Sequence, residues 1–363
     1  MIRTRLLLSA VLVSALVSAC QETKESAKPA PSASAAASAA SSAKPAFDPS
    51  ILGALQALPK SADGATPASP ERVALGKVLY FEARLSKNQD VSCISCHHLD
   101  AFGVDGQPTS EGHKKQHGDR NAPTVLNAAL HFRQFWDGRM ADVEEQARGP
   151  ILNPVEMASS EKLVVAVLSS MPEYVEAFKK AFPADKDPIT LKNAGIAMGA
   201  YERKLLTPAR FDKYLGGDKT AMTDAELAGA ALFVQTGCST CHMGPVIGGS
   251  MYQKAGLVKP WPNTKDQGRF EVTKQEADRM MFKVPSLRNV EKTAPYFHDG
   301  STATLDEAVR IMARHQLGKE LKDDEVKSII TFLGTLTAAP PTDLVAPPTL
   351  PKSTGKTPTP DPK

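Results

Sequence analysis

Two copies of one short motif constrain this chain more than any other feature. Residues 93–97 read CISCH and residues 238–242 read CSTCH, so both follow the pattern C-x-x-C-H. In this pattern the two cysteines form thioether bonds to a haem and the histidine binds its iron. A zinc site is the alternative, but each motif carries its own adjacent histidine. The motifs therefore predict two covalent c-type haems attached at Cys93, Cys96, Cys238 and Cys241, with His97 and His242 as proximal iron ligands.

The N-terminal segment has the features of an export signal. Two arginines precede the apolar run 6–17, which is too short to span a bilayer, so residues 1–19 are predicted to be a secretory signal peptide. The four residues that end in Cys20 (VSAC) resemble the lipobox of bacterial lipoproteins, which implies cleavage before Cys20 and a lipid anchor on its thiol. The expected location is the periplasm, with a membrane anchor, and Gln21 favours the outer membrane. A soluble periplasmic protein cleaved nearby is the alternative.

The segments on either side of the central body have biased compositions. Residues 20–49 are rich in Ala, Ser and Pro and cannot bury a core, so they are interpreted as a flexible tether. Residues 337–363 are proline-rich and are expected to be extended and partly disordered. At 363 residues the chain exceeds the usual size of one core, which favours two domains. The formal net charge of +3 is too small to suggest nucleic acid or an anionic lipid surface as a partner.

The body contains a diverged internal repeat. Residues 123–127 (PTVLN) lead to residues 135–138 (FWDG), and residues 285–289 (PSLRN) lead to residues 297–300 (FHDG). In both copies thirteen residues separate the proline from the Trp or His that follows the phenylalanine. Two copies of one haem-binding unit in tandem are the simplest explanation.

Helical signals run through both copies. Residues 223–226 (TDAE) have the pattern of a capping box, which predicts a helix that runs to the second haem motif. In residues 323–336 the apolar side chains recur on one helical face. No sustained alternation of apolar and polar residues demands a large sheet. The predicted fold is mainly α, with two cytochrome c-like haem domains in tandem, over residues 50–210 and 211–336.

Spacing alone does not identify the ligands opposite the two proximal histidines. Met312 shares a helical stripe with three apolar residues, which fits core packing. A thioether opposite His242 would instead raise the reduction potential of that haem and close its iron to substrate. His113 lies in a polar, glycine-bearing loop that can cover a haem face and also swing away. The histidines that compete for the distal positions are His98, His113, His117, His131, His298 and His315.

These motifs closely resemble those of the bacterial di-haem cytochrome c peroxidases over residues 50–336. The segments that carry the resemblance are both C-x-x-C-H motifs, EGHKKQHGDRNAPTVLNA, FWDGR, NPVEM, FKVPSLRNVEKTAPYFHDG and LDEAVRIMARHQLGKEL. The resemblance implies an enzyme that reduces hydrogen peroxide to water with electrons from a small c-type cytochrome or a cupredoxin. The family is commonly homodimeric.

The resemblance also implies a role for individual residues. His97 would bind a low-potential, peroxidatic haem, and His113 would be its removable distal ligand. His242 and Met312 would be the axial pair of a high-potential haem, whose reduction leads to the release of His113. Trp136 would lie between the haems. The remaining implied residues are Gln146 and Glu156 in the distal pocket, and Asn121, Thr293 and Pro295 at a calcium site between the domains.

The implied chemistry suits these residue types. Cleavage of peroxide needs a group that takes a proton from one oxygen and returns it to the other, which a carboxylate such as Glu156 can do. Gln146 cannot titrate, so it would orient peroxide or water by hydrogen bonding. Two alternatives are a di-haem oxidase that modifies a protein substrate and a non-enzymatic electron carrier. Met312 and the loop around His113 argue against the former, and Glu156 and Gln146 against the latter.

Overall fold

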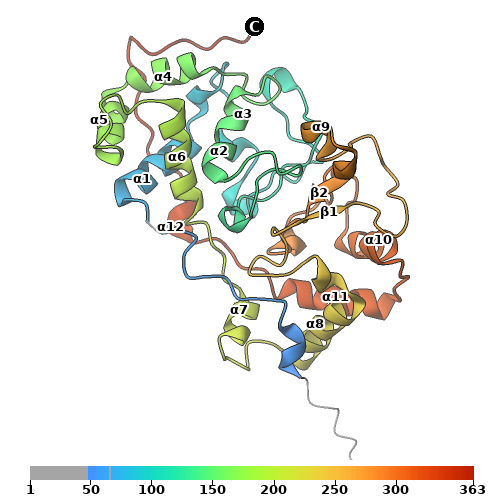
Figure 1. Ribbon diagram of the computed structural model, residues 1–363. Coiled ribbons are helices and arrows are strands. Elements are labelled where there is room, and N and C mark those ends of the chain that lie inside the picture. The colour runs from blue at the N-terminus through green and yellow to red at the C-terminus, as the bar shows by residue number, and fades with distance from the viewer. Residues whose placement is uncertain (1–47, 65–66) are drawn as a thin grey trace, which may run out of the picture. The chain divides into compact units, whose positions relative to one another are not determined.

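The computed structural model describes residues 48–64 and 67–363, and it is mainly helical as predicted (Figure 1). The predicted signal peptide, Cys20 and almost all of the tether lie outside these described residues. Within them, no helix is both long and apolar enough to cross a lipid bilayer. One small antiparallel sheet pairs β1 (Tyr252–Lys254) with β2 (Met281–Lys283).

The first half of the body, which contains the first haem motif, is built around two crossing helices. Ser69 caps the first of them, since its hydroxyl accepts a hydrogen bond from the backbone N–H of Arg72 at 3.3 Å, and Pro70 occupies the first helical position. The helices of this half are α1 (Pro70–Tyr80), α2 (Val143–Gln146), α3 (Arg148–Leu152), α4 (Glu161–Ser169), α5 (Pro172–Ala181) and α6 (Leu191–Glu202).

The second half repeats this plan. The predicted capping box is confirmed, because the Thr223 hydroxyl accepts from the Glu226 N–H at 3.3 Å and the Glu226 carboxylate accepts from the Thr223 N–H at 2.8 Å. The helix that it opens ends at Thr236, and Gly237 caps it directly before the second haem motif. The helices of this half are α7 (Arg210–Leu215), α8 (Asp224–Thr236), α9 (Phe270–Thr273), α10 (Leu305–Leu317) and α11 (Asp323–Gly334). The short α12 (Thr342–Val345) follows in the C-terminal segment and packs against the first half.

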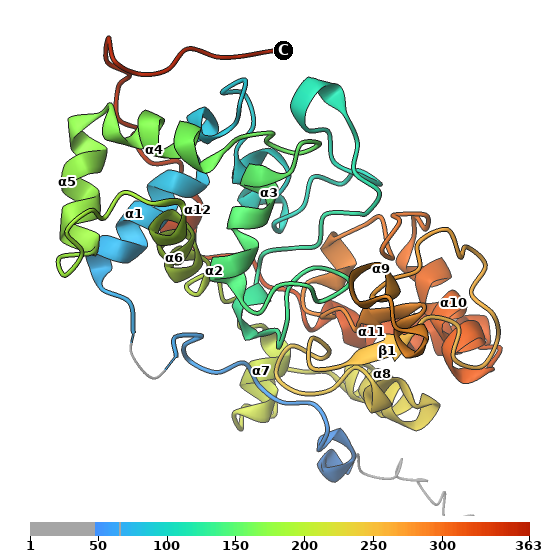
Figure 2. The ribbon, with the colours of Figure 1, turned by 45° about the horizontal axis from the view of Figure 1, so that its top comes forward.

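Corresponding helix pairs cross at a glycine in each half. Helices α1 and α6 lie side by side, as do α8 and α11 (Figures 1 and 2). A Cβ atom on Gly76 of α1 would lie 1.8 Å from the carbonyl oxygen of Ala197, and one on Gly229 of α8 would lie 2.1 Å from that of Ser328. No side chain fits at either crossing, so both glycines are required for the helices to approach this closely.

The repeat is also visible in the turns. Asn127 and Asn289 both have left-handed backbone conformations, with φ of 62° and 61°. Phe135 and Phe297 follow with φ of 66° and 71°. These positions correspond in the two sequence copies, so the predicted internal repeat is a repeat of backbone conformation as well.

The two ends of the body cross to opposite halves. Leu52 and Leu55 are buried in the core of the second half, although both lie in the range 50–210 that is predicted for the first domain. The proline-rich residues 337–363 run back along the first half, where Tyr201 donates a hydrogen bond to the Leu344 carbonyl at 2.7 Å (Figure 1). The tail is extended, as expected. It is not partly disordered, contrary to the expectation, because further hydrogen bonds connect it to Arg84, Gln89 and Ser170.

Candidate functional site

A cavity in the second half gathers the residues predicted for the second haem. The motif residues follow α8, whereas Met312 comes from α10 and Trp136 from the first half. All of them line this cavity, namely Cys238, Cys241, His242, Met312 and Trp136. Two thiols, an imidazole and a thioether in a mainly apolar cavity fit a covalently bound haem.

His242 is suited to bind iron. Burial lowers its pKa to about 4, so the imidazole is neutral and keeps a lone pair for the metal. Met312 and His298 both reach the cavity. His315 does not line it; its Nδ1 lies 2.7 Å from the Pro260 carbonyl oxygen. Met312 and His298 therefore lie at this haem site, as does His131 from the list of competing histidines, whereas His315 does not.

Hydrogen bonds hold the histidine of the first motif in place. The Nδ1 atom of His97 lies 3.2 Å from the Gly103 carbonyl oxygen, and Tyr80 donates a hydrogen bond to the His97 carbonyl at 3.1 Å. The contact at Nδ1 leaves Nε2 as the free nitrogen for iron. Burial lowers the pKa of His97, so this imidazole is also neutral.

The loop that carries His113 rests on the segment that carries Glu156. The backbone N–H of His113 donates a hydrogen bond to the Glu156 carbonyl at 2.7 Å, and the His113 side chain is 5% exposed. A Cβ atom on the preceding Gly112 would lie 2.2 Å from the Val155 carbonyl oxygen, so glycine permits this close approach. The predicted distal histidine and the predicted acid-base residue thus belong to one hydrogen-bonded unit.

The Glu156 carboxylate lies beside the first haem motif. Burial raises its pKa, whereas the Asn153 amide opposes the shift by donating a hydrogen bond at 2.6 Å. Burial is the main reason that the pKa values of the Cys93 and Cys96 thiols are raised, and the negative charge of Glu156 adds a smaller contribution to both. Gln146 is half-buried at the end of α2.

Trp136 connects the two halves. Its indole N–H donates to the Asn121 carbonyl at 2.9 Å, and the Asn121 N–H donates to the His298 carbonyl at 2.8 Å. The indole also meets the His298 ring edge to face, with centroids 6.3 Å apart. The two residues that correspond in the sequence repeat, Trp136 and His298, are therefore in contact.

The three predicted calcium ligands line the same cavity. Asn121, Thr293 and Pro295 come from both halves of the chain. The side-chain amide nitrogen of Asn121 donates to the Gln107 carbonyl at 2.9 Å, so the side-chain oxygen of Asn121 takes no part in that hydrogen bond. Among the described residues no group of three or more acidic, His or Cys side chains could hold a metal, so any calcium here would depend on amide and carbonyl oxygens.

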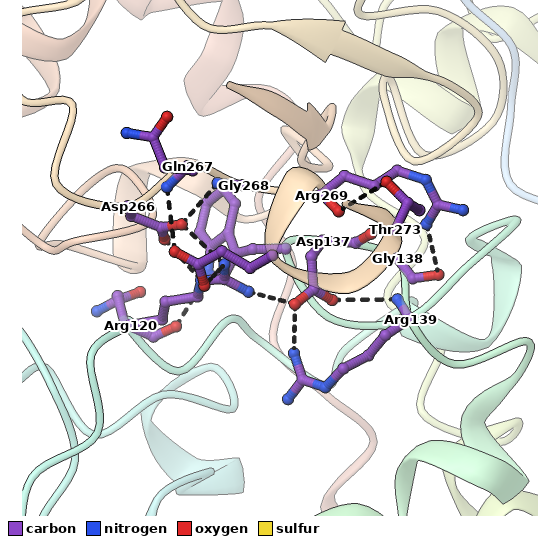
Figure 3. A network of polar contacts seen from close by, with 12 residues as sticks. Arg120, Asp137, Gly138, Arg139, Asp266, Gln267, Gly268, Arg269 and Thr273 are labelled. Carbon is purple, nitrogen blue, oxygen red and sulfur yellow. Dashed lines mark hydrogen bonds and ion pairs between the residues drawn. The ribbon is translucent and has the colours of Figure 1, made fainter. Parts of the chain in front are cut away.

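A charged network next to Asn121 was not predicted. Arg120 donates two hydrogen bonds to Asp266, at 2.6 and 2.8 Å, and also pairs with Asp137 of the FWDG element (Figure 3). Asp137 accepts from Arg139 at 2.8 Å, and its carbonyl accepts from Arg269 at 3.0 Å. Asp266 lies far from Arg120 in sequence and in no recognisable motif, so sequence patterns could not pair them.

Comparisons with known proteins agree with this architecture. Residues 70–220 match a family model described as di-haem cytochrome c peroxidase, and residues 226–337 match one described as cytochrome c. A cytochrome c551 peroxidase of Nitrosomonas europaea is 50% identical, covering 81% of this chain and 87% of the relative. One of Pseudomonas aeruginosa is 47% identical, covering 81% and 86%.

A solved structure has the same fold over most of its length. It is a MauG-like protein associated with microbial copper homeostasis, with a TM-score of 0.67 and 27% identity, and the match covers 84% of this chain and 97% of that protein. The predicted tandem of two cytochrome c-like domains is thus confirmed. With half of the residues identical to a named peroxidase over 81% of its length, the chain belongs to the bacterial di-haem cytochrome c peroxidases, oxidoreductases that act on peroxide and carry two c-type haems.

Proposed function

We propose that this peroxidase is held inactive by His113 and becomes active when His113 leaves the face opposite His97. When bound, the two haems supply the redox chemistry, the one at His242 accepting electrons and the one at His97 cleaving peroxide. The supporting observation is the hydrogen bond from the His113 N–H to the Glu156 carbonyl, 2.7 Å long. Because the loop rests on the segment of Glu156, its departure would open space next to that carboxylate.

The loop has a conformation that favours such a change. Lys114 and Lys115 both adopt left-handed backbone conformations, with φ of 56° and 58°. Residues other than glycine pay an energetic cost in this region, and such residues occur often in switch segments. His113 therefore sits at the start of a strained turn that can relax when its contacts change.

Glu156 would act as the acid-base residue. Reduction of one hydrogen peroxide to two waters consumes two electrons and two protons. The Glu156 carboxylate would take a proton from one peroxide oxygen and return it to the other, which would leave as water. Its burial and raised pKa suit a group that takes up and returns a proton during the reaction. Gln146 would hold peroxide by hydrogen bonds.

Three further roles belong to this proposal. Met312 would complete the ligand pair of the haem at His242, and Trp136 would couple the two haems electronically. A calcium ion would bind the side-chain oxygen of Asn121 and the carbonyls of Thr293 and Pro295. These groups line one cavity together with Trp136, so the ion would stabilise the contact between the two halves.

The cellular setting is proposed from the N-terminal sequence. A signal peptide over residues 1–19 and a lipid on Cys20 would anchor the enzyme in the periplasm, with residues 20–49 as tether. The electron donor would be a small c-type cytochrome or a cupredoxin. Radiolabelled fatty acid incorporation into the wild-type chain, but not into a Cys20→Ser chain, would establish the anchor; equal labelling would contradict it.

The switch is tested by comparing His113→Ala with His117→Ala. Both histidines lie in the same loop, but His117 is exposed. Fully oxidised wild-type protein and the His117 variant should react with peroxide only after one-electron reduction. The His113 variant should bind peroxide in the fully oxidised form, seen as an immediate change in the haem spectrum. Full activity of oxidised wild-type protein without reduction would exclude the switch.

A further inference from the structure

Lys283 is a buried cation inside the cavity of the second haem. Lys283 is the last residue of β2, and it is 5% exposed. Among the described residues that line the cavity, it is the only Lys, Arg, Asp or Glu. Burial lowers its pKa to about 8, because water no longer stabilises the ammonium. A buried charge of this kind needs an oppositely charged partner.

The hydrogen bonds of Lys283 leave its charge uncompensated. Its Nζ lies 3.2 Å from Nδ1 of His131, which is neutral, and no acidic side chain of the described residues lines the cavity beside it. Since an ammonium can only donate, Nδ1 of His131 must accept, which places the imidazole proton on Nε2. That Nε2 is buried and has no hydrogen-bond partner among the described residues.

The pair therefore presents donors without an acceptor. Lys283 has N–H groups beyond the one directed at His131, and His131 adds its Nε2–H. Both residues line the cavity that also contains Cys238, Cys241 and His242. A group that satisfies several donors and also neutralises a cation is an oxyanion such as a carboxylate.

The two side chains are held in place by neighbouring backbone. The backbone N–H of Lys283 donates to the Trp136 carbonyl at 2.7 Å, and Lys283 pairs with Tyr252 across the β1–β2 sheet. A Cβ atom on Gly249 would lie 2.5 Å from Cδ2 of His131, so the imidazole packs directly on a glycine. His131 comes from the first half and Lys283 from the second, so the pair spans both.

We propose that Lys283 and His131 form the binding site for a propionate of the haem attached to Cys238 and Cys241. The propionates are the anionic side groups of a c-type haem, and the cavity offers them one cation. The pairing has a consequence for electron transfer. A fixed positive charge near the iron stabilises the reduced state, because reduction removes one positive charge from the iron. Lys283 thus acts as a positioning residue that raises the reduction potential of this haem.

The site also places the propionate next to Trp136. Lys283 is hydrogen-bonded through its backbone to Trp136, whose ring lines the same cavity. A haem edge fixed at Lys283 would lie close to the residue that connects the two halves. The inference deepens the proposed entry of electrons at the second haem, but it requires neither the release of His113 nor ligation by Met312.

The test compares Lys283→Gln with Lys254→Gln in the di-haem protein. Lys254 lies on β1 of the same sheet but is exposed, so its loss removes an equal charge into solvent. Spectroelectrochemical titration without peroxide or donor reports the midpoint potential of each haem. At the wild-type midpoint, Lys283→Gln should lower the ratio of reduced to oxidised second haem several-fold, where tenfold equals about 59 mV for one electron. Lys254→Gln should leave both midpoints unchanged.

Two further variants separate charge from structure. Lys283→Arg keeps the cation and should restore most of the potential. His131→Leu removes the neutral donor and should shift the second haem in the same direction by a smaller factor, which also provides the test if Lys283→Gln does not fold. An unchanged second-haem potential in folded Lys283→Gln, or in His131→Leu when that variant is the only one available, would overturn the proposal. Wild-type protein that shows no peroxidase turnover, while Lys283→Gln still lowers the second-haem potential, would instead count against the proposed function and leave this inference standing.

Discussion

Asn127 and Asn289, which correspond in the internal repeat, donate hydrogen bonds from their side-chain amides to the same oxygen. This oxygen is the hydroxyl of Thr207, at 2.8 and 2.9 Å, and all three residues are fully buried. The Thr207 N–H also donates to the side-chain oxygen of Asn127 at 3.0 Å. Thr207 lies between α6 and α7, so the two repeats meet at one hydroxyl group in the connection between them.

Replacing this hydroxyl should destabilise both halves together. Thr207→Val keeps the shape but leaves two buried amide donors without an acceptor, at about 1–3 kcal/mol each. The free energy of unfolding, measured by urea titration, should fall by roughly 2–6 kcal/mol. Thr207→Ser retains the oxygen and is the matched control, with a much smaller loss. Equal stability of the Val and Ser variants would show that the shared acceptor contributes little.

The pH dependence of turnover should report on Glu156. Because burial raises the pKa of this carboxyl group, its ionised form is lost as pH falls through a value above that of an exposed glutamate. If the ionised form is the base, kcat/KM should fall on the acid side in that range. Asn153→Ala removes a hydrogen bond that lowers the pKa, so the acid limb should move to higher pH.

Removal of the carboxylate should abolish that limb. Glu156→Gln should reduce kcat/KM by about 10²–10⁴-fold and make the remainder independent of pH on the acid side. Glu176→Gln, an exposed position on α5, should behave as wild type. A Glu156→Gln enzyme with the wild-type rate and acid limb would remove Glu156 from the mechanism.

The strained turn after His113 should influence the rate of activation. Lys114 has φ of 56°, which costs a side-chain-bearing residue about 1–2 kcal/mol relative to glycine. Lys114→Gly should therefore stabilise the inactive loop and slow the appearance of activity after one-electron reduction by roughly 5–30-fold. Stopped-flow mixing with peroxide at successive times after reduction measures this lag. Lys114→Ala retains the strain and should keep the wild-type lag; identical lags in both variants would contradict the role of strain.

The Arg120 network should hold the loop of Asp266 against the first half. Asp266→Asn removes the charge from a two-point contact with a mostly buried guanidinium, which should cost about 1–3 kcal/mol. Glu271→Gln changes the half-exposed acid of the same network and should cost less than about 1 kcal/mol. Thermal unfolding should distinguish the two variants. Similar melting temperatures would indicate that solvent screens the Asp266 pair as well.

Local patterns predicted much of the haem-binding framework. The capping box at Thr223 formed as expected because its two hydrogen bonds involve residues three apart, which the helix itself brings together. The repeat was visible because matching turns need matching residues, as at Asn127 and Asn289. The roles predicted for His113 and Glu156 came from the resemblance to known peroxidases. The backbone groups of these two residues are hydrogen-bonded to each other.

Other features depended on contacts that no local pattern encodes. The tail 337–363 has the composition of a disordered segment, yet Arg84 and Tyr201 bind its carbonyls. Proline-rich chain forms no internal ladder, so its order depends on partners elsewhere in the protein. His315 was an alternative iron ligand in sequence, but the turn of α10 directs it to the Pro260 carbonyl.

The sequence by itself determined that this protein carries two covalent haems in two related helical units. That information is local, because attachment needs two cysteines and a histidine within five residues. Only the tertiary structure decided that Lys283 reaches His131, that Arg120 reaches Asp266, and that Thr207 serves both repeats. A buried charge or amide takes whichever partner the folded chain brings within about 3 Å, and sequence separation places no limit on that choice.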